Sequence, residues 1–309
     1  MPWRPRHLRE GSRQRVPEPE LRHVRTTPPT VLTVAGSDSS GGAGAQADIL
    51  TFQALGVLGA TAITAVTSQS TLGVQRVDPL PAPAVEAQIL SVVEDIDVSA
   101  VKTGMLANAE IADLIVSLAA GGRLPNLVVD PVLAASDGSP LATDDTLDVY
   151  LDLFKHAAVI TPNASEAVRL VRPAKAVQPE TGAALDHVAE QLHELSDGAT
   201  VVVTGGDATG TGDCTDIVCD ASGVIHLSAP RLRSRNTHGT GCTFSAAIAA
   251  HLAAGCGRRE AVEQAKRYVS RAIASAAGWR VGSTSGHGPL DHLAGALPCG
   301  AGGLSEELQ

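Results

Sequence analysis

A glycine-rich turn near the end of the chain has the composition of an anion-binding loop. Residues 236–242 read NTHGTGC and lead directly into an Ala-rich segment with helical character. Glycines let backbone N–H groups point into one concavity, and the dipole of the following helix adds positive potential, so an anion is favoured there. Thr240 could donate one more hydrogen bond. The chain contains no GK[ST] sequence and therefore no Walker A loop. A capped helix with glycines for close packing would explain the same residues.

A second loop of small residues spans Gly36–Asp48 and follows a short apolar run. Four glycines fall within the nine residues Gly36–Gly44. Residues this small permit a flat ligand to approach the backbone closely. Asp48 falls in the first part of the next expected helix, where the dipole stabilises a carboxylate whether or not it binds anything. A structural turn would explain most of these glycines, but not four of them in so short a stretch.

A third polar segment, Asn163–Glu166, follows the apolar run that ends in Thr161 and Pro162. A glutamate one turn into a helix at a strand end could hold a hydrated Mg²⁺ next to nucleotide phosphates. The same two side chains could instead form a capping box, in which each bonds the backbone of the other. The sequence around them does not decide between these two interpretations.

These three segments are separated by alternating strand and helix patterns. Strands are expected at 30–35, 60–67, 98–102, 127–130, 158–161 and 200–204, with a hairpin formed by 214–219 and 224–228. Helices are expected at 45–55, 83–94, 109–120, 144–154, 163–171, 184–195, 240–254 and 260–277. Such alternation predicts a mostly parallel sheet with helices on both faces. Ligands bind beyond the carboxyl ends of the strands in sheets of this kind.

Composition agrees with a single α/β core and excludes some partners. The 309 residues are 44% hydrophobic but only 2% aromatic, so Ala, Val, Leu and Gly supply the apolar content. The net charge of −10 argues against nucleic acid as a partner. No apolar run approaches the length of a membrane span, and no signal segment is recognisable at the start. We therefore expect a cytoplasmic protein with no nucleic-acid or membrane partner.

The two ends differ from the rest of the chain. Residues 1–29 hold seven arginines against three glutamates, are rich in proline and lack periodic apolar positions, which predicts disorder. This extension would be a solvated tail, or a basic arm that touches an acidic partner. Residues 30–292 are expected to form one domain, and 293–309 a flexible, Gly-rich tail. The five cysteines are odd in number and form no CxxC, so neither a disulfide framework nor a metal site is indicated.

Taken in order, several segments resemble the hydroxymethylpyrimidine/phosphomethylpyrimidine kinase family of thiamine biosynthesis, a branch of the ribokinase superfamily. The matching strings are VAGSDSSGGAGAQAD at 34–48, TAVTSQSTLG at 64–73, KTGMLA at 102–107, VDPV at 129–132, ITPNASEA at 160–167 and NTHGTGCT at 236–243. The resemblance implies a ribokinase-like three-layer α/β sandwich that uses ATP and Mg²⁺. It also implies two successive phosphorylations of 4-amino-5-hydroxymethyl-2-methylpyrimidine, and a homodimer.

The resemblance also assigns roles to individual positions. It implies a pyrimidine pocket formed by Gln69, Gly36, Asp48 and Met105. It implies a nucleotide side formed by Asn163, Glu166 and Thr204, with Asp130 and Glu166 next to Mg²⁺. It implies a phosphoryl-transfer loop formed by Gly239, Thr240, Gly241 and Cys242. The amide of Gln69 suits an aminopyrimidine because it offers one donor and one acceptor to the complementary edge of the ring.

Cys242 stands where most ribokinase relatives have an aspartate that acts as the base for the substrate hydroxyl. A thiolate whose pKa is lowered at a helix N-terminus could accept that proton. Alternatively, Cys242 only shapes the loop and the phosphates take the proton. Our hypothesis is that Cys242 is a base of intermediate importance.

Two lysines that the family commonly has are absent. The stretch Leu133–Pro140 contains none, and Thr204 stands at the position of the other. A lysine near the transferring phosphate would add positive charge to the transition state, so the rate and the second phosphorylation are in question. Arg231, Arg233 and Arg235 precede the glycine-rich turn and could compensate, or they could form a solvated basic edge.

Two other functions remain open. Pyridoxal is also a flat heterocycle with a hydroxymethyl group, so a pyridoxal or pyridoxine kinase is the nearest alternative. Gln69 favours the aminopyrimidine, because pyridoxal lacks an adjacent amino group to satisfy both ends of the amide. The second alternative is a degenerate kinase that serves as a ligand-binding module, which the two missing lysines suggest.

Overall fold

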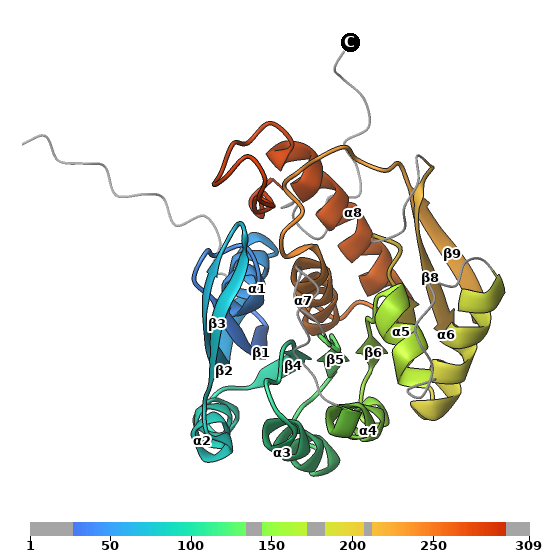
Figure 1. Ribbon diagram of the computed structural model, residues 1–309. Helices are drawn as coiled ribbons and strands as arrows, with labels where there is room; N and C mark the ends of the chain where they lie inside the picture. The colour runs from blue at the N-terminus through green and yellow to red at the C-terminus, as the bar shows by residue number, and fades with distance from the viewer. Residues whose placement is uncertain (1–26, 134–143, 172–182, 207–211, 295–309) are drawn as a thin grey trace, which may run out of the picture.

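The computed structural model describes residues 27–133, 144–171, 183–206 and 212–294. One nine-stranded sheet runs through this part of the chain in the order β3-β2-β1-β4-β5-β6-β7-β8-β9 (Figure 1). Its strands are β1 (Thr30–Asp38), β2 (Leu58–Ser70), β3 (Gly73–Pro79), β4 (Val98–Thr103), β5 (Val128–Val129), β6 (Val159–Ile160), β7 (Thr200–Val203), β8 (Cys214–Asp220) and β9 (Gly223–Ala229). The six central strands, β2, β1, β4, β5, β6 and β7 in their order in the sheet, are parallel. Strands β3, β8 and β9 pair antiparallel at the two edges.

Helices cover both faces of this sheet. They are α1 (Gly44–Ala54), α2 (Ala82–Val93), α3 (Ala109–Ala120), α4 (Asp144–Phe154), α5 (Ala164–Val171), α6 (Ala183–Leu195), α7 (Thr240–Ala253) and α8 (Arg258–Ala276). One buried cluster joins α2 to α6 with the sheet, and another joins α1, α7 and α8 with its opposite face. The expected three-layer architecture with a mostly parallel sheet is therefore confirmed.

The alternation of side chains along the strands explains how both faces become apolar. In β1, Leu32 and Val34 belong to the cluster under α2 to α6, whereas Val31 belongs to the cluster under α1, α7 and α8. Successive residues of a strand point to opposite faces, so a strand covered on both sides needs apolar residues at nearly every position. Thr33 interrupts this pattern on the α1 side although it is fully buried. Its hydroxyl donates a hydrogen bond to Asp48 on α1.

Two helix starts show why the chain changes direction where it does. Asn108 precedes α3 in an extended conformation, and its side-chain oxygen accepts a hydrogen bond from the Ile111 backbone N–H at 2.9 Å. This bond satisfies one of the N–H groups that a helix start leaves unpaired. Gly239 precedes α7 with φ +82°, in the left-handed region. The glycine-rich turn therefore bends sharply just before the helix begins.

Strand β3 was not expected from the sequence. It pairs antiparallel with the end of β2 and forms a two-stranded ribbon at the edge of the sheet, with Val66 facing Asp78 and Gln69 facing Val74. Every residue of β3 is at least partly exposed, so the alternation of apolar and polar residues that identifies a half-buried strand is weak. The other predicted elements are present, with ends that differ by at most three residues.

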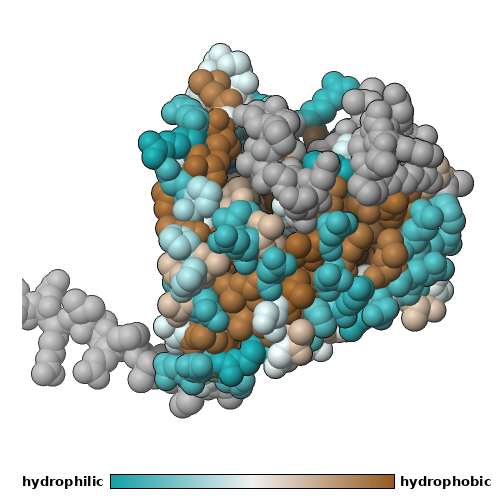
Figure 2. All heavy atoms as spheres, turned by 60° about the horizontal axis from the view of Figure 1, so that its bottom comes forward, coloured by the Kyte–Doolittle hydropathy of each residue, from teal (hydrophilic) through white to brown (hydrophobic). Residues whose placement is uncertain are grey.

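The outer surfaces are of mixed character. Figure 2 turns the end that carries α2, α3 and α4 toward the viewer and shows hydrophilic and hydrophobic residues side by side. Within the described residues, none of the helices is both long and apolar enough to cross a membrane. The predicted extension 1–29 and tail 293–309 lie almost entirely outside the described residues.

Candidate active site

The carboxyl ends of the central strands surround a cavity. Of the residues expected to bind the pyrimidine, Gly36, Gln69 and Met105 line it, and so does Cys242 from the start of α7. They come from β1, β2, the segment after β4 and α7, which lie far apart in sequence. The fold thus brings together four of the positions that the sequence had placed in one site.

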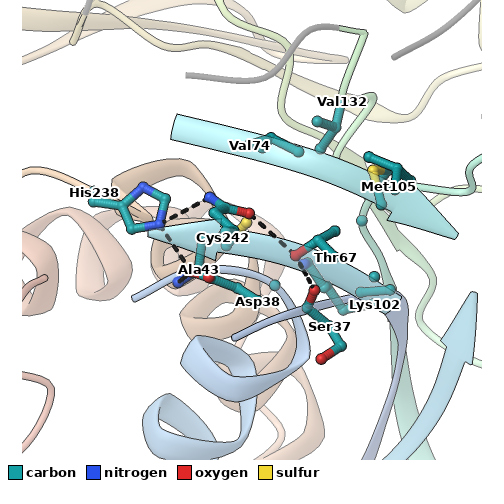
Figure 3. Close-up of a pocket in the computed structure, with 16 residues that line it drawn as sticks. Ser37, Asp38, Ala43, Thr67, Val74, Lys102, Met105, Val132, His238 and Cys242 are labelled. Carbon is teal, nitrogen blue, oxygen red and sulfur yellow. Dashed lines mark hydrogen bonds and ion pairs between the residues drawn. The ribbon is translucent and has the colours of Figure 1, made fainter. Parts of the chain in front are cut away.

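Gly36 and Met105 form one wall. A Cβ atom at Gly36 would overlap the terminal methyl group of Met105, so only glycine lets this side chain lie across the end of β1. Val74 and Val77 of β3 and Val132 after β5 add further apolar surface (Figure 3). A flat, largely apolar ring would be accommodated between these side chains.

Gln69 carries the polar group of this wall. One end of its amide lies 3.2 Å from His238 Nε2 and the other end 3.4 Å from Thr67 Oγ1. Its backbone is held by Ser39, whose hydroxyl donates to the Gln69 carbonyl oxygen and accepts from the Gln69 N–H, both at 2.8 Å. The β2–β3 ribbon and the first glycine-rich loop therefore position the amide from two sides.

Asp48 differs from the expectation that it lines the cavity. It lies behind the wall on α1 with no exposed side-chain surface, and both of its oxygens contact Lys102 Nζ, at 2.9 and 3.1 Å. Thr33 Oγ1 donates to the same carboxylate at 2.5 Å. Lys102 itself reaches the cavity. Asp48 therefore acts on the site through this lysine.

The Lys102 ammonium is the main positive charge under the cavity. Burial alone would lower its pKa, but the carboxylate of Asp48 and the nearby Cys242 and Asp130 raise it overall. Burial raises the pKa of Asp48, and Lys102 and Thr33 oppose that effect. The contacts of Nζ with both oxygens show that the two groups form an ion pair.

The glycine-rich turn meets the first loop at one point. A Cβ atom at Gly239 would overlap the carbonyl oxygen of Gly42, and one at Gly42 would lie 2.5 Å from the His238 ring. The two loops can approach this closely only because both positions are glycine. The Thr240 hydroxyl donates back to the Thr237 carbonyl oxygen at 2.7 Å and closes the turn. The start of α7 is thereby held against the end of β1.

The hypothesis that the helix lowers the pKa of Cys242 is wrong. Burial raises the pKa of this thiol to about 12. Lys102 and the Gly44 N–H favour the thiolate, but the carboxylates of Asp130 and Asp48 oppose it. The sequence could not show this, because both carboxylates come from distant segments. At neutral pH Cys242 is a thiol.

Asp130 lies after β5, next to α7 rather than in the cavity wall. Its side chain accepts a hydrogen bond from Ser245 Oγ at 3.0 Å, and it is almost fully buried. Burial raises the pKa of Asp130, while Lys102 and the Ser245 hydroxyl lower it. A cation near this carboxylate would be stabilised, since it would offset the cost of burying the charge.

Asn163 and Glu166 form a capping box. The Glu166 N–H donates to Asn163 Oδ1, and the Asn163 N–H donates to Glu166 Oε2, both at 2.9 Å. The second oxygen of Glu166 accepts from the Leu133 N–H at 3.2 Å. Thr204 lies on the next strand end and forms a β-bridge with Asn163. These three expected nucleotide-side residues therefore lie together at the ends of β6 and β7.

The two carboxylates that the resemblance assigns to Mg²⁺ already have partners, since both Glu166 oxygens accept backbone N–H groups and Asp130 accepts from the Ser245 hydroxyl. Nowhere in the described ranges are three His, Cys, Asp or Glu side chains grouped as a metal site. Mg²⁺ usually needs only one or two carboxylates, because water and phosphates supply its remaining ligands. Asp130 and Glu166, which follow the neighbouring strands β5 and β6, are the two carboxylates that the resemblance placed there.

Two of the three arginines that precede the glycine-rich turn hold loops. Arg231 donates to the carbonyl oxygens of Gly206 at 3.1 Å and Gly205 at 3.3 Å. Arg235 donates to three carbonyl oxygens between residues 281 and 284, the shortest contact being 2.7 Å to Ser283. Arg233 is exposed. Of the two places where a family lysine is missing, the first falls in Leu133–Pro140, and residues 134–140 lie outside the described residues.

Sequence reasoning did not single out Lys102, His238 or Asp38. Each stands inside a quoted motif, but the motif alone does not say which of its side chains point into the cavity. For Lys102 a signal existed, since a charged residue in an otherwise apolar strand must find a partner when it is buried. For the other two the partner is 200 residues away along the chain.

Comparison with known proteins agrees with this geometry. The family model for phosphomethylpyrimidine kinase matches residues 38–291. The hydroxymethylpyrimidine/phosphomethylpyrimidine kinase of Streptomyces coelicolor is 45% identical over 268 residues, which are 86% of this chain and 95% of that enzyme. A chloroplastic thiamine biosynthetic bifunctional enzyme of Arabidopsis thaliana is 41% identical over 86% of this chain. The matched part is 50% of that longer protein.

Solved structures show the same fold. A pyridoxal kinase of Bacillus subtilis in complex with ADP matches with a TM-score of 0.76 and 33% identity, over 86% of this chain and 98% of that one. A phosphomethylpyrimidine kinase of Clostridium difficile matches with a TM-score of 0.68 and 35% identity, over 79% of this chain and 99% of that one.

The sheet and its two helical layers, with the cavity at the strand ends, are the ribokinase-like fold that this chain shares with the small-molecule kinases just described. Within that class, the chain belongs to the phosphomethylpyrimidine kinase family.

Proposed function

We propose that this protein transfers a phosphoryl group from ATP to 4-amino-5-hydroxymethyl-2-methylpyrimidine and then to the resulting monophosphate, as a step of thiamine biosynthesis. The observation that carries the proposal is Gln69, whose amide lies in the wall of a cavity that also contains Lys102 and the Cys242 thiol. An amide offers a donor and an acceptor side by side, which matches an amino group next to a ring nitrogen. The proposal is supported by relatives that carry the name hydroxymethylpyrimidine/phosphomethylpyrimidine kinase and align with most of this chain.

In this proposal the residues of the chain position and stabilise, and none forms a covalent bond with the substrate. The substrate hydroxyl oxygen attacks the terminal phosphorus of ATP, the bond to the bridging oxygen breaks, and ADP leaves. The start of α7 after Gly239 favours the transferred phosphoryl group through its N–H groups and dipole. Lys102 adds positive charge beneath the cavity. Such transfer depends mainly on positioning and charge stabilisation.

The hydroxyl proton passes to the phosphate in this account. Burial raises the pKa of the Cys242 thiol to about 12, which disfavours the thiolate that a base would need. The thiol can still donate a hydrogen bond and fill the space beside the substrate. Of the two roles considered for Cys242 from the sequence, we therefore propose the shaping role.

ATP and Mg²⁺ complete the proposal. Asn163, Glu166 and Thr204 form the nucleotide side, and Asp130 and Glu166 would hold Mg²⁺, which neutralises phosphate charge during transfer. Glu166→Gln tests this, because glutamine keeps an acceptor for the Asn163 N–H but removes the charge and the acceptor of the Leu133 N–H. We expect a higher Mg²⁺ requirement together with a lower thermal midpoint, because one buried donor loses its partner. An unchanged Mg²⁺ dependence would remove Glu166 from the metal site.

Pyridoxal is the second candidate substrate, because several similar structures are pyridoxal kinases. Selectivity decides between the two. We expect Gln69→Met, which keeps the volume of the side chain and removes both polar atoms, to lower kcat/KM for the aminopyrimidine by about tenfold or more. Its effect on pyridoxal should be smaller. If Gln69→Met affected both substrates equally, the amide would not read the pyrimidine edge.

We further propose that the protein works in the cytoplasm as a homodimer joined through the β2–β3 ribbon. Val66 and Leu72 are 49% and 63% exposed there, beside β3, which is the outermost strand on this side of the sheet within the described residues. Exposed apolar residues beside an open strand edge favour pairing. Light scattering should give twice the mass of one chain, and Val66→Asp combined with Leu72→Asp should give a monomer. A wild-type monomer at micromolar concentration would contradict this part.

A further inference from the structure

One ring nitrogen of His238 lies between two side chains at the edge of the cavity. His238 Nε2 is 2.8 Å from Asp38 Oδ2 and 3.2 Å from the amide end of Gln69 that carries Nε2 (Figure 3). The His238 and Asp38 side chains are only 6% and 3% exposed. Water therefore cannot easily replace either partner. Each donor in this group must then face an acceptor.

Asp38 is an acceptor only. It accepts from the Ser40 and Ala43 N–H groups at 2.8 Å, from the Gly42 N–H at 3.2 Å and from the Ser40 hydroxyl at 2.8 Å. Burial raises the pKa of Asp38, but the hydrogen bonds from His238, Ser40 and Ala43 outweigh this effect and lower the pKa to about 2. The carboxylate is therefore ionised at neutral pH, and His238 must donate to it. Nε2 of His238 carries a proton, whether the ring is neutral or charged.

A protonated Nε2 has no lone pair and cannot accept from the NH₂ group of Gln69. The amide end that faces His238 is then the oxygen, which shares the single Nε2 hydrogen with Asp38 as the more distant acceptor, 3.2 Å away. The two ends of an amide have the same shape, and only their hydrogen bonds distinguish them. Thr67 is consistent with this arrangement. Its hydroxyl proton goes to the Ser37 carbonyl oxygen at 2.6 Å, so its lone pair is available to the other end of the amide, 3.4 Å away.

We propose that His238, fixed by Asp38, orients the Gln69 amide with its oxygen toward His238 and its NH₂ group toward Thr67. This rests on the proposed function and adds a positioning residue that determines specificity. The amide oxygen would accept from the 4-amino group, and the NH₂ group would donate to the ring nitrogen. The 5-hydroxymethyl group is next to the 4-amino group, so it falls on the His238 side. The segment that starts at His238 continues into Gly239–Cys242, the proposed phosphoryl-transfer loop.

The test uses two substrates that differ only in this edge. In 5-hydroxymethyl-2-methylpyrimidin-4-one an acceptor replaces the amino group and an N–H replaces the ring acceptor, so both partners of the amide are reversed. The wild-type enzyme should prefer the 4-amino compound in kcat/KM. His238→Ala frees the amide to rotate, and the preference should fall about tenfold or more. A merely structural role of His238 would lower both activities together and leave their ratio unchanged, which would overturn the proposal.

Two further variants sharpen the result. His238→Gln retains an NH₂ group that can donate to both Asp38 and Gln69, so it should preserve more of the preference than His238→Ala. His226→Ala is the matched control, because His226 Nε2 also lies 2.8 Å from a carboxylate, that of Asp186, but on β9. It should leave the ratio as in the wild type. An equal loss of preference in His226→Ala would contradict the assignment to His238.

The proton position can be measured without turnover. Nitrogen NMR of the histidine-labelled wild-type protein should show a protonated Nε2 on His238, assigned by the loss of its signal in His238→Gln. An unprotonated Nε2 would overturn the proposal. If the enzyme phosphorylated neither pyrimidine, the proposed function would fail, while this spectrum would still test whether His238 Nε2 is a donor toward Gln69.

Discussion

At the scale of single residues, the Lys102 ammonium and the Asp48 carboxylate face each other with no exposed surface on either side chain. Lys102→Met should therefore leave a buried charge without its counter-ion and reduce the free energy of unfolding by about 3–5 kcal/mol. Urea denaturation measures this. Adding Asp48→Asn removes the remaining charge and should recover part of the loss. A change of less than about 1 kcal/mol in the single variant would mean that the pair is not what holds α1 to β4.

Cys242 gives a second prediction at this scale. Its pKa is raised to about 12, so the group is protonated below that pH and stays a thiol from pH 6 to 9. Iodoacetamide should modify Cys242 much more slowly than a free small-molecule thiol at pH 8, as peptide mass analysis can show. Cys242→Ala should lower kcat by less than about tenfold, whereas loss of a general base usually costs about 10²–10⁴-fold. A loss in that larger range would restore the role of base.

At the scale of elements, the junction of two loops is the sensitive point. Gly239 has φ +82° and no room for a Cβ atom beside the Gly42 carbonyl oxygen, whereas a Cβ atom at Gly241 would meet nothing within 4 Å. Gly239→Ala should therefore lower both the thermal midpoint and kcat, because the start of α7 must move away from the end of β1. Gly241→Ala serves as the control for stability and should unfold within about 2 °C of the wild type. Equal stability of the two variants would show that the junction can relax.

The ribbon formed by β2 and β3 is the element that sequence reasoning missed. Its outer strand is exposed and carries no regular apolar alternation, so the local pattern contained little information. Yet Val74 and Val77 of this strand line the cavity. The valines of β3 face the cavity rather than the hydrophobic core, so the pattern that marks core strands in a sequence is weak here.

At the scale of the whole molecule, the order of strands and helices followed from periodicity, because the central strands are buried on both faces and most helices on one face. Helix α7 is the exception, since every residue from Thr243 to Leu252 is buried. The partners across the site did not follow. Asp38 and His238 are 200 residues apart, and Asp48 and Lys102 are 54 apart. Only the fold brings such groups into contact, so the pKa of Cys242 and the location of Asp48 could not be obtained from the motifs that contain them.

The central claim is that the cavity at the strand ends is where an aminopyrimidine alcohol receives a phosphoryl group from ATP. Purified protein with Mg-ATP, incubated in parallel with hydroxymethylpyrimidine, its monophosphate and pyridoxal and analysed by product mass, tests this most directly. We expect the pyrimidine to gain one phosphoryl group and its monophosphate a second. Phosphorylation of pyridoxal alone, or binding of these compounds without any transfer, would contradict the account.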